Sequence, residues 1–312
     1  MTESQLLRLG TRGSPLALIQ AEEVRDRLST ANPALTVEIV VIKTTGDRVQ
    51  DRPLSEIGGK GLFTKEIDLA LERGEIDAAA HSMKDVPTWL PEGQCLAAIL
   101  PREDPRDALF ANSAGSLGEL PHGAVVGTTS LRRQAIVKLA RPDLTVVSIR
   151  GNVETRLRKL AEGQVQATLL AVAGLKRLGQ AGLLRCILEP EEMLPAVGQG
   201  AIGVTARADD EPTLANLAKI SDESSFARVA AERACLDVLD GSCHTPIAGL
   251  AELSGDGASL RLRALVAWPD GRQAYHAEDS GPVEAPEALG RAVGQALRDQ
   301  AGPAFFEALA GS

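Results

Sequence analysis

Two segments far apart in the chain share one pattern, in which an apolar strand leads through a Gly-Thr turn to a serine and then a helix. The first has its strand at residues 6–9 and its turn at 10–14. The second has its strand at 124–126 and its turn at 127–130. Serine is favoured just before a helix, and the proline that follows Ser14 is favoured as the first helical residue. The repeat predicts two α/β domains of similar build, whose turns face each other.

A third segment, residues 76–87, begins as a strand of small apolar residues and ends in polar ones. Pro87 stops any regular continuation, because proline lacks an N–H and restricts the residue before it. Lys84 and Asp85 therefore lie just past the carboxyl end of a strand, where open α/β sheets bind ligands. They offer an anion anchor and a carboxylate. The alternative is a surface turn with a solvated charge pair.

The charge is distributed unevenly. The whole chain carries a net charge of -9, whereas residues 127–159 hold eight basic and two acidic residues, a local charge of +6. Arg132 and Arg133 follow the helix-capping Ser130, Arg150 follows a predicted strand, and Arg156 lies in the next predicted helix. Cations at a helix N-terminus oppose the helix dipole, so stability does not require them there. The pattern favours a site for several carboxylates or phosphates, and the alternative is a solvated basic face.

The rest of the chain fits around these segments. A glycine-bearing stretch at 43–61 has the length of a lid, with Lys60 placed to close over an anion. Segments 101–107 and 194–204 read as crossings between domains, and a smaller α+β domain follows from about residue 221. We predict a first α/β domain from residues 1–100 and 200–219, a second from 101–199, and a C-terminal domain from 220–312. Periodicity predicts further strands at 36–42, 144–149, 166–171, 247–253 and 260–266, and helices at 63–73, 131–140, 221–239 and 286–298.

Composition excludes several classes of protein. Hydrophobic residues make up 44% and charged residues 24%, which is typical of a globular protein, and 3% aromatics leave little for stacking on bases. An acidic chain has no general affinity for nucleic acid or anionic membranes. No apolar run approaches the roughly 20 residues of a membrane span. The N-terminus shows no export signal, so we expect a cytoplasmic protein.

The four cysteines differ in their surroundings. Cys95, Cys186 and Cys235 lie in apolar or helical segments and are expected to be small core residues. Cys243 lies in a loop of Gly, Ser, Thr and Pro, where a thiol is reachable as a nucleophile or attachment point. The alternative is an inert loop cysteine. No pair has the spacing of a metal site, so we expect no metal.

Taken together, these segments resemble the porphobilinogen deaminase (hydroxymethylbilane synthase) family. The likeness runs from about residue 6 to 246 and rests on nine stretches of sequence. They are residues 11–17, 58–63, 81–87, 102–107, 127–133, 150–153, 170–179 and 195–200, with Cys243 in its loop.

The resemblance implies two similar α/β domains built like a type II periplasmic binding protein, plus a small C-terminal α+β domain. It implies a transferase of tetrapyrrole (porphyrin and heme) biosynthesis that joins four porphobilinogen units head to tail into hydroxymethylbilane, losing ammonia at each step. A dipyrromethane cofactor would be held by a thioether to Cys243. Each pyrrole bears an acetate and a propionate, which explains a concentrated arginine lining. Loss of ammonia leaves a cationic azafulvene, which a carboxylate can stabilise.

The resemblance also implies roles for individual residues. Asp85 would be the catalytic carboxylate, and Lys60 the lid cation. The cofactor would be bound by Ser82, Lys84, Thr128, Ser130, Arg132 and Arg133. The incoming substrate would be bound by Arg12, Ser14, Arg150, Arg156 and Arg177. We further expect a monomer that hands its product to uroporphyrinogen-III synthase.

One position departs from the family, because Glu56 stands in the lid stretch where a lysine is common. Two other functions remain open from the residues alone. A binding module for an anionic metabolite would explain the paired turns and the arginines, but not Cys243 or Asp85. A cysteine-dependent acyl transferase would lack a base for Cys243.

Overall fold

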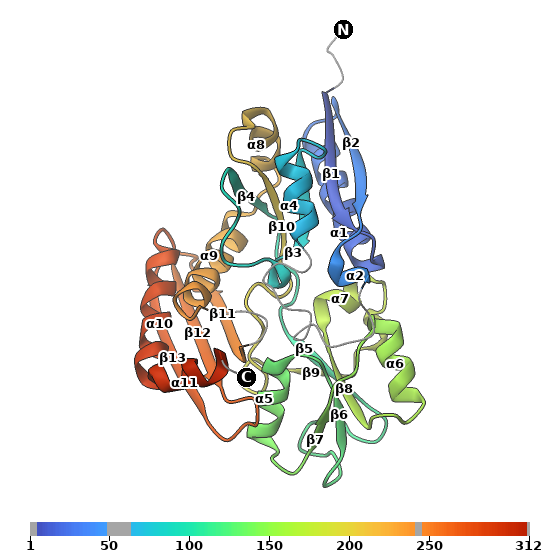
Figure 1. Cartoon of the computed structure of the whole chain (residues 1–312), viewed down its shortest axis with the longest axis vertical. Coiled ribbons are helices and arrows are strands. Elements are labelled where there is room, and N and C mark those ends of the chain that lie inside the picture. Colours follow the sequence, from blue (N-terminus) through green and yellow to red (C-terminus); the bar gives the residue numbers. More distant parts are fainter. Residues whose placement is uncertain (1–4, 49–63, 241–244, 311–312) are drawn as a thin grey trace. The chain divides into compact units, whose positions relative to one another are not determined.

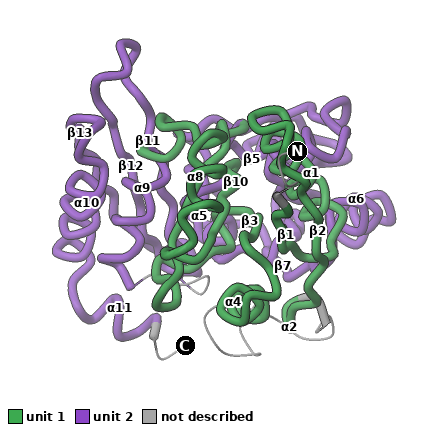
Figure 2. Tube along the Cα trace, turned by 90° about the horizontal axis from the view of Figure 1, so that it is seen from above, with its two compact units in different colours: residues 1–103, 200–227 green, residues 104–199, 228–312 purple. Residues whose placement is uncertain are grey.

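The computed structural model describes residues 5–48, 64–240 and 245–310, and the chain divides into two compact units (Figure 2). Unit 1 comprises Met1–Glu103 and Gly200–Ala227, and unit 2 comprises Asp104–Gln199 and Arg228–Ser312. The last crossing between them falls inside helix α9 (Glu223–Val238). The separation of residues 220–312 as a third domain stays a prediction.

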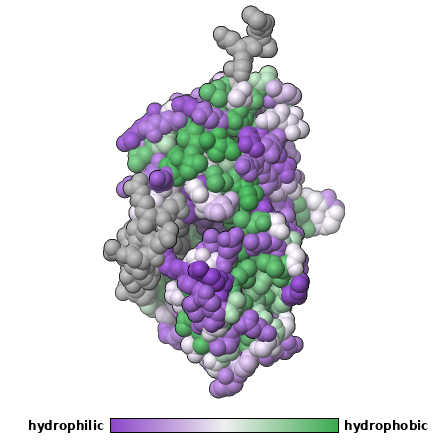
Figure 3. Space-filling model, turned by 90° about the vertical axis from the view of Figure 1, so that its right-hand side faces the viewer, coloured by the Kyte–Doolittle hydropathy of each residue, from purple (hydrophilic) through white to green (hydrophobic). Residues whose placement is uncertain are grey.

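Unit 1 is built on a five-stranded sheet in the order β2-β1-β3-β10-β4. Strand β1 pairs in parallel with β2 and β3, whereas β10 runs antiparallel to both β3 and β4. The strands are β1 (Gln5–Arg12), β2 (Leu35–Ile42), β3 (Ala78–Ser82), β4 (Gln94–Ile99) and β10 (Ile202–Arg207). Strand β2 lies at one edge of the sheet, and its Val41 is 51% exposed. Figure 3 shows apolar surface on the side of the molecule that it presents.

Both faces of the unit 1 sheet are covered, which explains why β3 consists largely of alanine. Ala78 and Ala80 join a core with helix α1 (Pro15–Ala31), and Ala79 joins a separate core with α4 (Lys65–Glu72). Successive side chains of a strand point to opposite faces, so small residues let both helices approach. The remaining helices of the unit are α2 (Thr45–Arg48), the 3-10 turn η1 (Met83–Asp85) and α8 (Glu211–Ala218) (Figure 1).

Unit 2 contains a second sheet of the same design, in the order β7-β6-β8-β5-β9. Strand β6 pairs in parallel with β7 and β8, and β5 runs antiparallel to β8 and β9. In each sheet, the strand that enters just after a crossing between units, β10 or β5, is the antiparallel one. The strands are β5 (Asp107–Ala111), β6 (Val125–Gly127), β7 (Thr145–Val147), β8 (Ala167–Ala171) and β9 (Cys186–Leu188). The helices are α5 (Leu131–Ala140), α6 (Val153–Ala161), α7 (Val172–Arg177) and the 3-10 turn η2 (Ala181–Leu183).

The C-terminal part of unit 2 is an antiparallel meander with helices. Strands β11 (Ile247–Leu253), β12 (Ser259–Ala267) and β13 (Ala274–Pro282) pair in chain order, and α10 (Pro286–Ala301) and α11 (Pro303–Ala310) follow. Residues of β11 and β12 share one hydrophobic core with α5, β6 and β8. Gly290 of α10 lies so close to α9 that a Cβ would overlap the carbonyl oxygen of Ala231.

The predicted class, two similar α/β sheets plus a small C-terminal α+β portion, is confirmed. The predicted helix at 131–140 and strand at 247–253 coincide with α5 and β11. The other predicted elements are present with ends shifted by a few residues. The sequence analysis missed β4, β5, β9, β13, α2, α7, α8 and α11.

Candidate active site

In unit 1, the turn after β1 is held by its own side chains. Ser14 caps α1, with its Oγ accepting a hydrogen bond from the Ala17 backbone N–H at 3.3 Å. The buried Thr11 hydroxyl donates to the Ala17 carbonyl at 3.1 Å. Arg12, the last residue of β1, is therefore fixed at its backbone, while its side chain stays 22% exposed. The predicted capping serine is confirmed.

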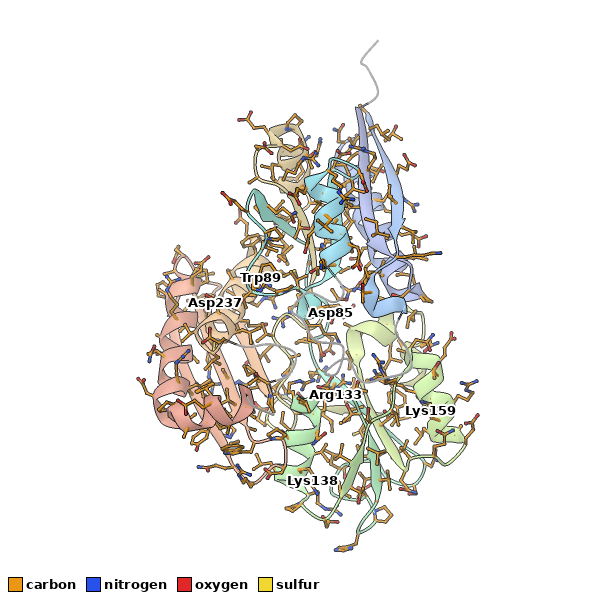
Figure 4. All side chains as sticks on the ribbon, in the orientation of Figure 1. Asp85, Trp89, Arg133, Lys138, Lys159 and Asp237 are labelled. Carbon is orange, nitrogen blue, oxygen red and sulfur yellow. The ribbon has the colours of Figure 1, made fainter. Side chains whose placement is uncertain are left out.

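Asp85 lies in the 3-10 turn that directly follows β3, as the sequence predicted (Figure 4). The Met83 N–H donates to the Ala201 carbonyl at 3.0 Å, and the Val86 N–H donates to the Met83 carbonyl at 3.2 Å. These backbone bonds fix the turn. The Asp85 side chain is 37% exposed, and its Oδ2 lies 4.0 Å from Arg12 Nη1. The structure thus brings Arg12 and Asp85 together and leaves the carboxylate open.

The neighbours of Asp85 differ in their exposure and in their hydrogen bonds to the rest of the fold. Lys84 is exposed. Ser82 exchanges hydrogen bonds with Gln20 of α1, at 2.8 Å and 3.1 Å. The Gln20 side chain, only 4% exposed, was missed from the sequence because it lies 62 residues away in the chain. Met83 packs over Gly203, where a Cβ would overlap its sulfur.

In unit 2, the equivalent turn places Ser130 at the start of α5. Its Oγ accepts from the Arg133 N–H at 3.4 Å, and its own N–H donates to Thr128 Oγ1 at 3.1 Å. Thr128 is buried and Ser130 is half-buried. Here too the serine predicted to start the helix does so.

Arg132 and Arg133 are not solvated at the mouth of this turn, because both are 5% exposed and share the carboxylate of Asp107. Arg132 Nη2 donates to Oδ2 at 2.6 Å, and Arg133 Nη2 donates to Oδ1 at 2.7 Å. Burial by itself raises the pKa of Asp107, but the two guanidinium groups outweigh it and hold that pKa well below its usual range. The sequence analysis missed this partner, since it placed Asp107 at the end of a charged crossing.

A second group of arginines in unit 2 brings positive charges close to one another. Arg156 Nε donates to the Gly151 carbonyl at 2.9 Å, and Nη2 lies 3.5 Å from Thr129 Oγ1. Burial, together with the positive charges of Arg133 and Arg150, lowers the pKa of Arg156 to about 10. Cations that disfavour one another are suited to binding an anion. Arg177, the last residue of α7, is half-buried.

Other basic residues of the 127–159 segment are used by the fold. Lys138 Nζ donates to the carbonyls of Pro142 and Leu144, both at 2.9 Å. Arg141 bonds Asp143 and three backbone carbonyls of the 117–120 turn. The local excess of charge is therefore only partly available to a ligand.

Three of the cysteines are poor nucleophiles. Burial raises the pKa of Cys95, of Cys186 (where Glu192 and Glu119 add to it), and of Cys235, the last to about 12. Cys243 and Lys60, with Glu56, lie outside the described residues. Within residues 5–48, 64–240 and 245–310, no cluster of side chains is suited to a metal ion. In the same part of the chain, no helix is both long and apolar enough to cross a membrane.

Solved structures of periplasmic proteins match the chain only weakly. They include a VFT2 domain of BvgS from Bordetella pertussis, with TM-score 0.42 and 15% identity over 70% of this chain and 88% of that one. The methionine-binding protein MetQ has TM-score 0.41 and 14% identity over 71% and 90%. Likenesses of this size carry no argument.

Comparison with protein families and curated sequences is decisive. Residues 7–215 match the family model "Porphobilinogen deaminase, dipyromethane cofactor binding domain", and residues 226–299 match "Porphobilinogen deaminase, C-terminal domain". A porphobilinogen deaminase of Paracoccus denitrificans is 57% identical over 96% of both chains. A chloroplastic porphobilinogen deaminase of Oryza sativa is 54% identical over 97% of this chain and 86% of its own. The chain therefore belongs to the porphobilinogen deaminase family.

Proposed function

We propose that Asp85 is the catalytic carboxylate of this chain and that Cys243 is the attachment point of its cofactor. The chain is a transferase of tetrapyrrole biosynthesis that deaminates four porphobilinogen units and joins them head to tail into hydroxymethylbilane. The observation that carries the assignment of Asp85 is its place, an open carboxylate just past β3 with one arginine nitrogen at 4.0 Å.

The chemistry needs such a carboxylate. In each cycle the C–N bond of the substrate aminomethyl group breaks and ammonia leaves, which creates a positive charge on the pyrrole. A C–C bond then forms between that methylene carbon and a ring carbon of the next pyrrole, and this ring carbon gives up its proton. Asp85 stabilises both cationic stages and accepts protons, while Arg12 steadies its Oδ2.

The arginines of unit 2 fit the cofactor, which the family description names as dipyrromethane. When bound, dipyrromethane supplies the pyrrole to which new units are added. It bears acetate and propionate side chains, which suit Arg132 and Arg133, since each guanidinium has a buried Nε–H with no hydrogen-bond partner among the described residues. We assign Ser82, Lys84, Thr128 and Ser130 to the same group.

The incoming porphobilinogen would be held by the remaining cations. In unit 2, the positive charges of Arg150 and Arg156 lie next to Arg133, and in unit 1 Arg12 lies 4.0 Å from Asp85. Ser14 and Arg177 complete the proposed substrate set, and Lys60 the proposed lid contact. We further propose three domains, a monomer in the cytoplasm, and delivery of the product to uroporphyrinogen-III synthase.

Intact mass tests the attachment site. We expect the purified protein to be heavier than its sequence by two deaminated porphobilinogen units, and the Cys243→Ser variant to have its sequence mass. Porphobilinogen is then added to any protein found without the extra mass. A Cys243→Ser protein that still gains the two units places the attachment elsewhere.

Cys235→Ser is the matched control, because its thiol is 2% exposed and its pKa is raised to about 12. That variant should keep the added mass. If it loses the mass and the Cys243 variant keeps it, the assignment of the cysteine is wrong.

A further inference from the structure

Asp107 is a buried carboxylate of unit 2 that accepts hydrogen bonds from three side chains. It is fully buried, and three side-chain donors reach it at 2.6, 2.7 and 2.8 Å, from Arg132, Arg133 and Gln199. The Nη1 of each arginine also donates a hydrogen bond to a backbone carbonyl, Arg132 to Leu194 and Arg133 to Leu169, both at 2.7 Å. Neither guanidinium can rotate without breaking two strong hydrogen bonds.

The same cluster joins the first two of the three places where the chain changes units. Asp107 opens β5, four residues after the crossing at Glu103. Gln199 is the last residue before the return to unit 1, and its Nε2 donates to the Pro105 carbonyl at 2.7 Å as well as to Asp107. Leu194, which Arg132 holds, belongs to the returning segment. One carboxylate thus ties both crossing segments to the arginine pair.

The cluster also sets the charge that the arginines present. Two guanidinium groups and one carboxylate leave a net charge of +1, and the only buried side-chain nitrogens of the pair that lack a partner among the described residues are the two Nε atoms. A pair used only for stability would be expected to spend those donors inside the fold. The fixed pair therefore keeps a net positive charge and two N–H donors that the described residues do not satisfy.

We propose that Asp107 is the positioning residue of the transferase: it fixes Arg132 and Arg133 in the orientation that holds the carboxylates of the growing pyrrole chain. The inference rests on the proposed role of those two arginines. Asp107 itself does not contact the reacting atoms, and it acts on the reaction through the place of the terminal pyrrole. Because the proposed substrate contacts Arg12, Arg150 and Arg156 do not bond Asp107, its loss should change kcat and leave KM near its normal value.

The test is the Asp107→Asn variant, assayed per molecule that carries the two pyrrole units by intact mass. We expect kcat to fall by about 100-fold, the cost of a small misplacement of a reacting group, with KM within about 2-fold of the wild type. The matched control is Asp77→Asn in unit 1. Asp77 also binds two arginines, Arg8 at 2.7 Å and Arg207 at 3.2 Å, at the opposite end of β3 from Asp85. That control should lose stability and keep its kcat per loaded molecule.

Two further variants separate the effect of the position of the carboxylate from the effect of its charge. They also provide a test if Asp107→Asn does not fold. Asp107→Asn with Gln199→Glu restores the charge of the cluster but not its geometry, since a glutamate cannot donate to the Pro105 carbonyl, so kcat should stay low. Gln199→Ala keeps both arginine bonds to Asp107 and removes one donor, so kcat should fall by about 5-fold, the effect of one hydrogen bond.

The proposal is overturned if Asp107→Asn matches Asp77→Asn in kcat per loaded molecule, or if the carboxylate swap restores kcat. If Asp107→Asn does not fold, an unchanged kcat in Gln199→Ala overturns it. Arg132→Gln and Arg133→Gln distinguish a failure of the proposed role of the arginines from a failure of the inferred role of Asp107. If these variants retain full kcat, the proposed role of the arginines fails, and this inference falls with it; if they lose kcat and Asp107→Asn does not, only this inference fails.

Discussion

Asp85 and Asp107 are two carboxylates beside arginines at strand ends, and the fold treats them in opposite ways. Asp85 is 37% exposed, with Arg12 at 4.0 Å. Asp107 is fully buried, with three donors within 2.8 Å. A carboxylate that the protein saturates cannot respond to charge that develops on a substrate, whereas one that it leaves partly open can. The difference supports our proposal that Asp85 performs chemistry and Asp107 positions other groups.

The strongest way to break this comparison is Asp85→Asn. We expect kcat to fall by about 10²- to 10⁴-fold, because the amide can neither stabilise the cationic stages nor accept a proton. The free energy of unfolding should stay within about 0.5 kcal/mol of the wild type, since the side chain is exposed and its only described ion pair is long. Steady-state kinetics and urea unfolding measure the two quantities. Near-normal turnover would remove Asp85 from the mechanism.

The two aspartates also differ in how well their structural positions could be predicted from the sequence. The position of Asp85 can be predicted from the sequence, because its strand consists of consecutive small apolar residues and Pro87 ends it. Asp107 stands among prolines and charges, and it begins a buried strand only because Arg132 and Arg133, 25 and 26 residues later, neutralise it. Local patterns predict an element when its own residues show the expected spacing of apolar side chains. They predict α5 and β11 correctly on that basis, and they miss β5 and β13, where charged residues interrupt the spacing. In β13 the alternation is interrupted by Glu278 and Asp279 on an exposed edge strand.

The pH dependence of the free energy of unfolding tests the role of Asp107 in this comparison. Its pKa in the folded protein lies below the unfolded value of about 3.9, so its contribution to stability is complete above that value and is lost as the pH falls through the folded pKa. At neutral pH, Asp107→Asn should lower the free energy of unfolding by about 3–5 kcal/mol, the cost of breaking a buried ion pair. Urea unfolding of both proteins between pH 7 and pH 3 should show the difference constant above about pH 5 and shrinking below about pH 4.

The Asp85→Asn protein serves as the control for an Asp-to-Asn change at an exposed side chain. A difference between wild type and Asp107→Asn that grows as the pH falls would contradict the ion-pair account. It would mean that Asp107 is protonated in the folded protein and that the arginines are held by something else.

The smallest expected effect concerns how Asp85 is held, since its position depends on backbone and packing and not on strong side-chain bonds. Gly203 of β10 faces Met83, the first residue of the turn that carries Asp85, and a Cβ there would overlap the Met83 sulfur and lie 3.1 Å from Ile99 Cδ1. Met83 is 2% exposed and has little room to move. Gly203→Ala should therefore cost about 1–3 kcal/mol of stability and shift the turn enough to lower kcat.

A double-mutant cycle separates crowding from other effects of the new methyl group. Met83→Ala in the Gly203→Ala background removes the overlapping atoms, so the two changes should be less harmful together than their separate costs predict. Additive losses would mean that Met83 does not transmit the change, and that Asp85 is fixed by the backbone bonds from Met83 to Ala201 and from Val86 to Met83 alone. In either case the open aspartate takes its position from its turn, whereas Asp107 takes its position from the side chains around it.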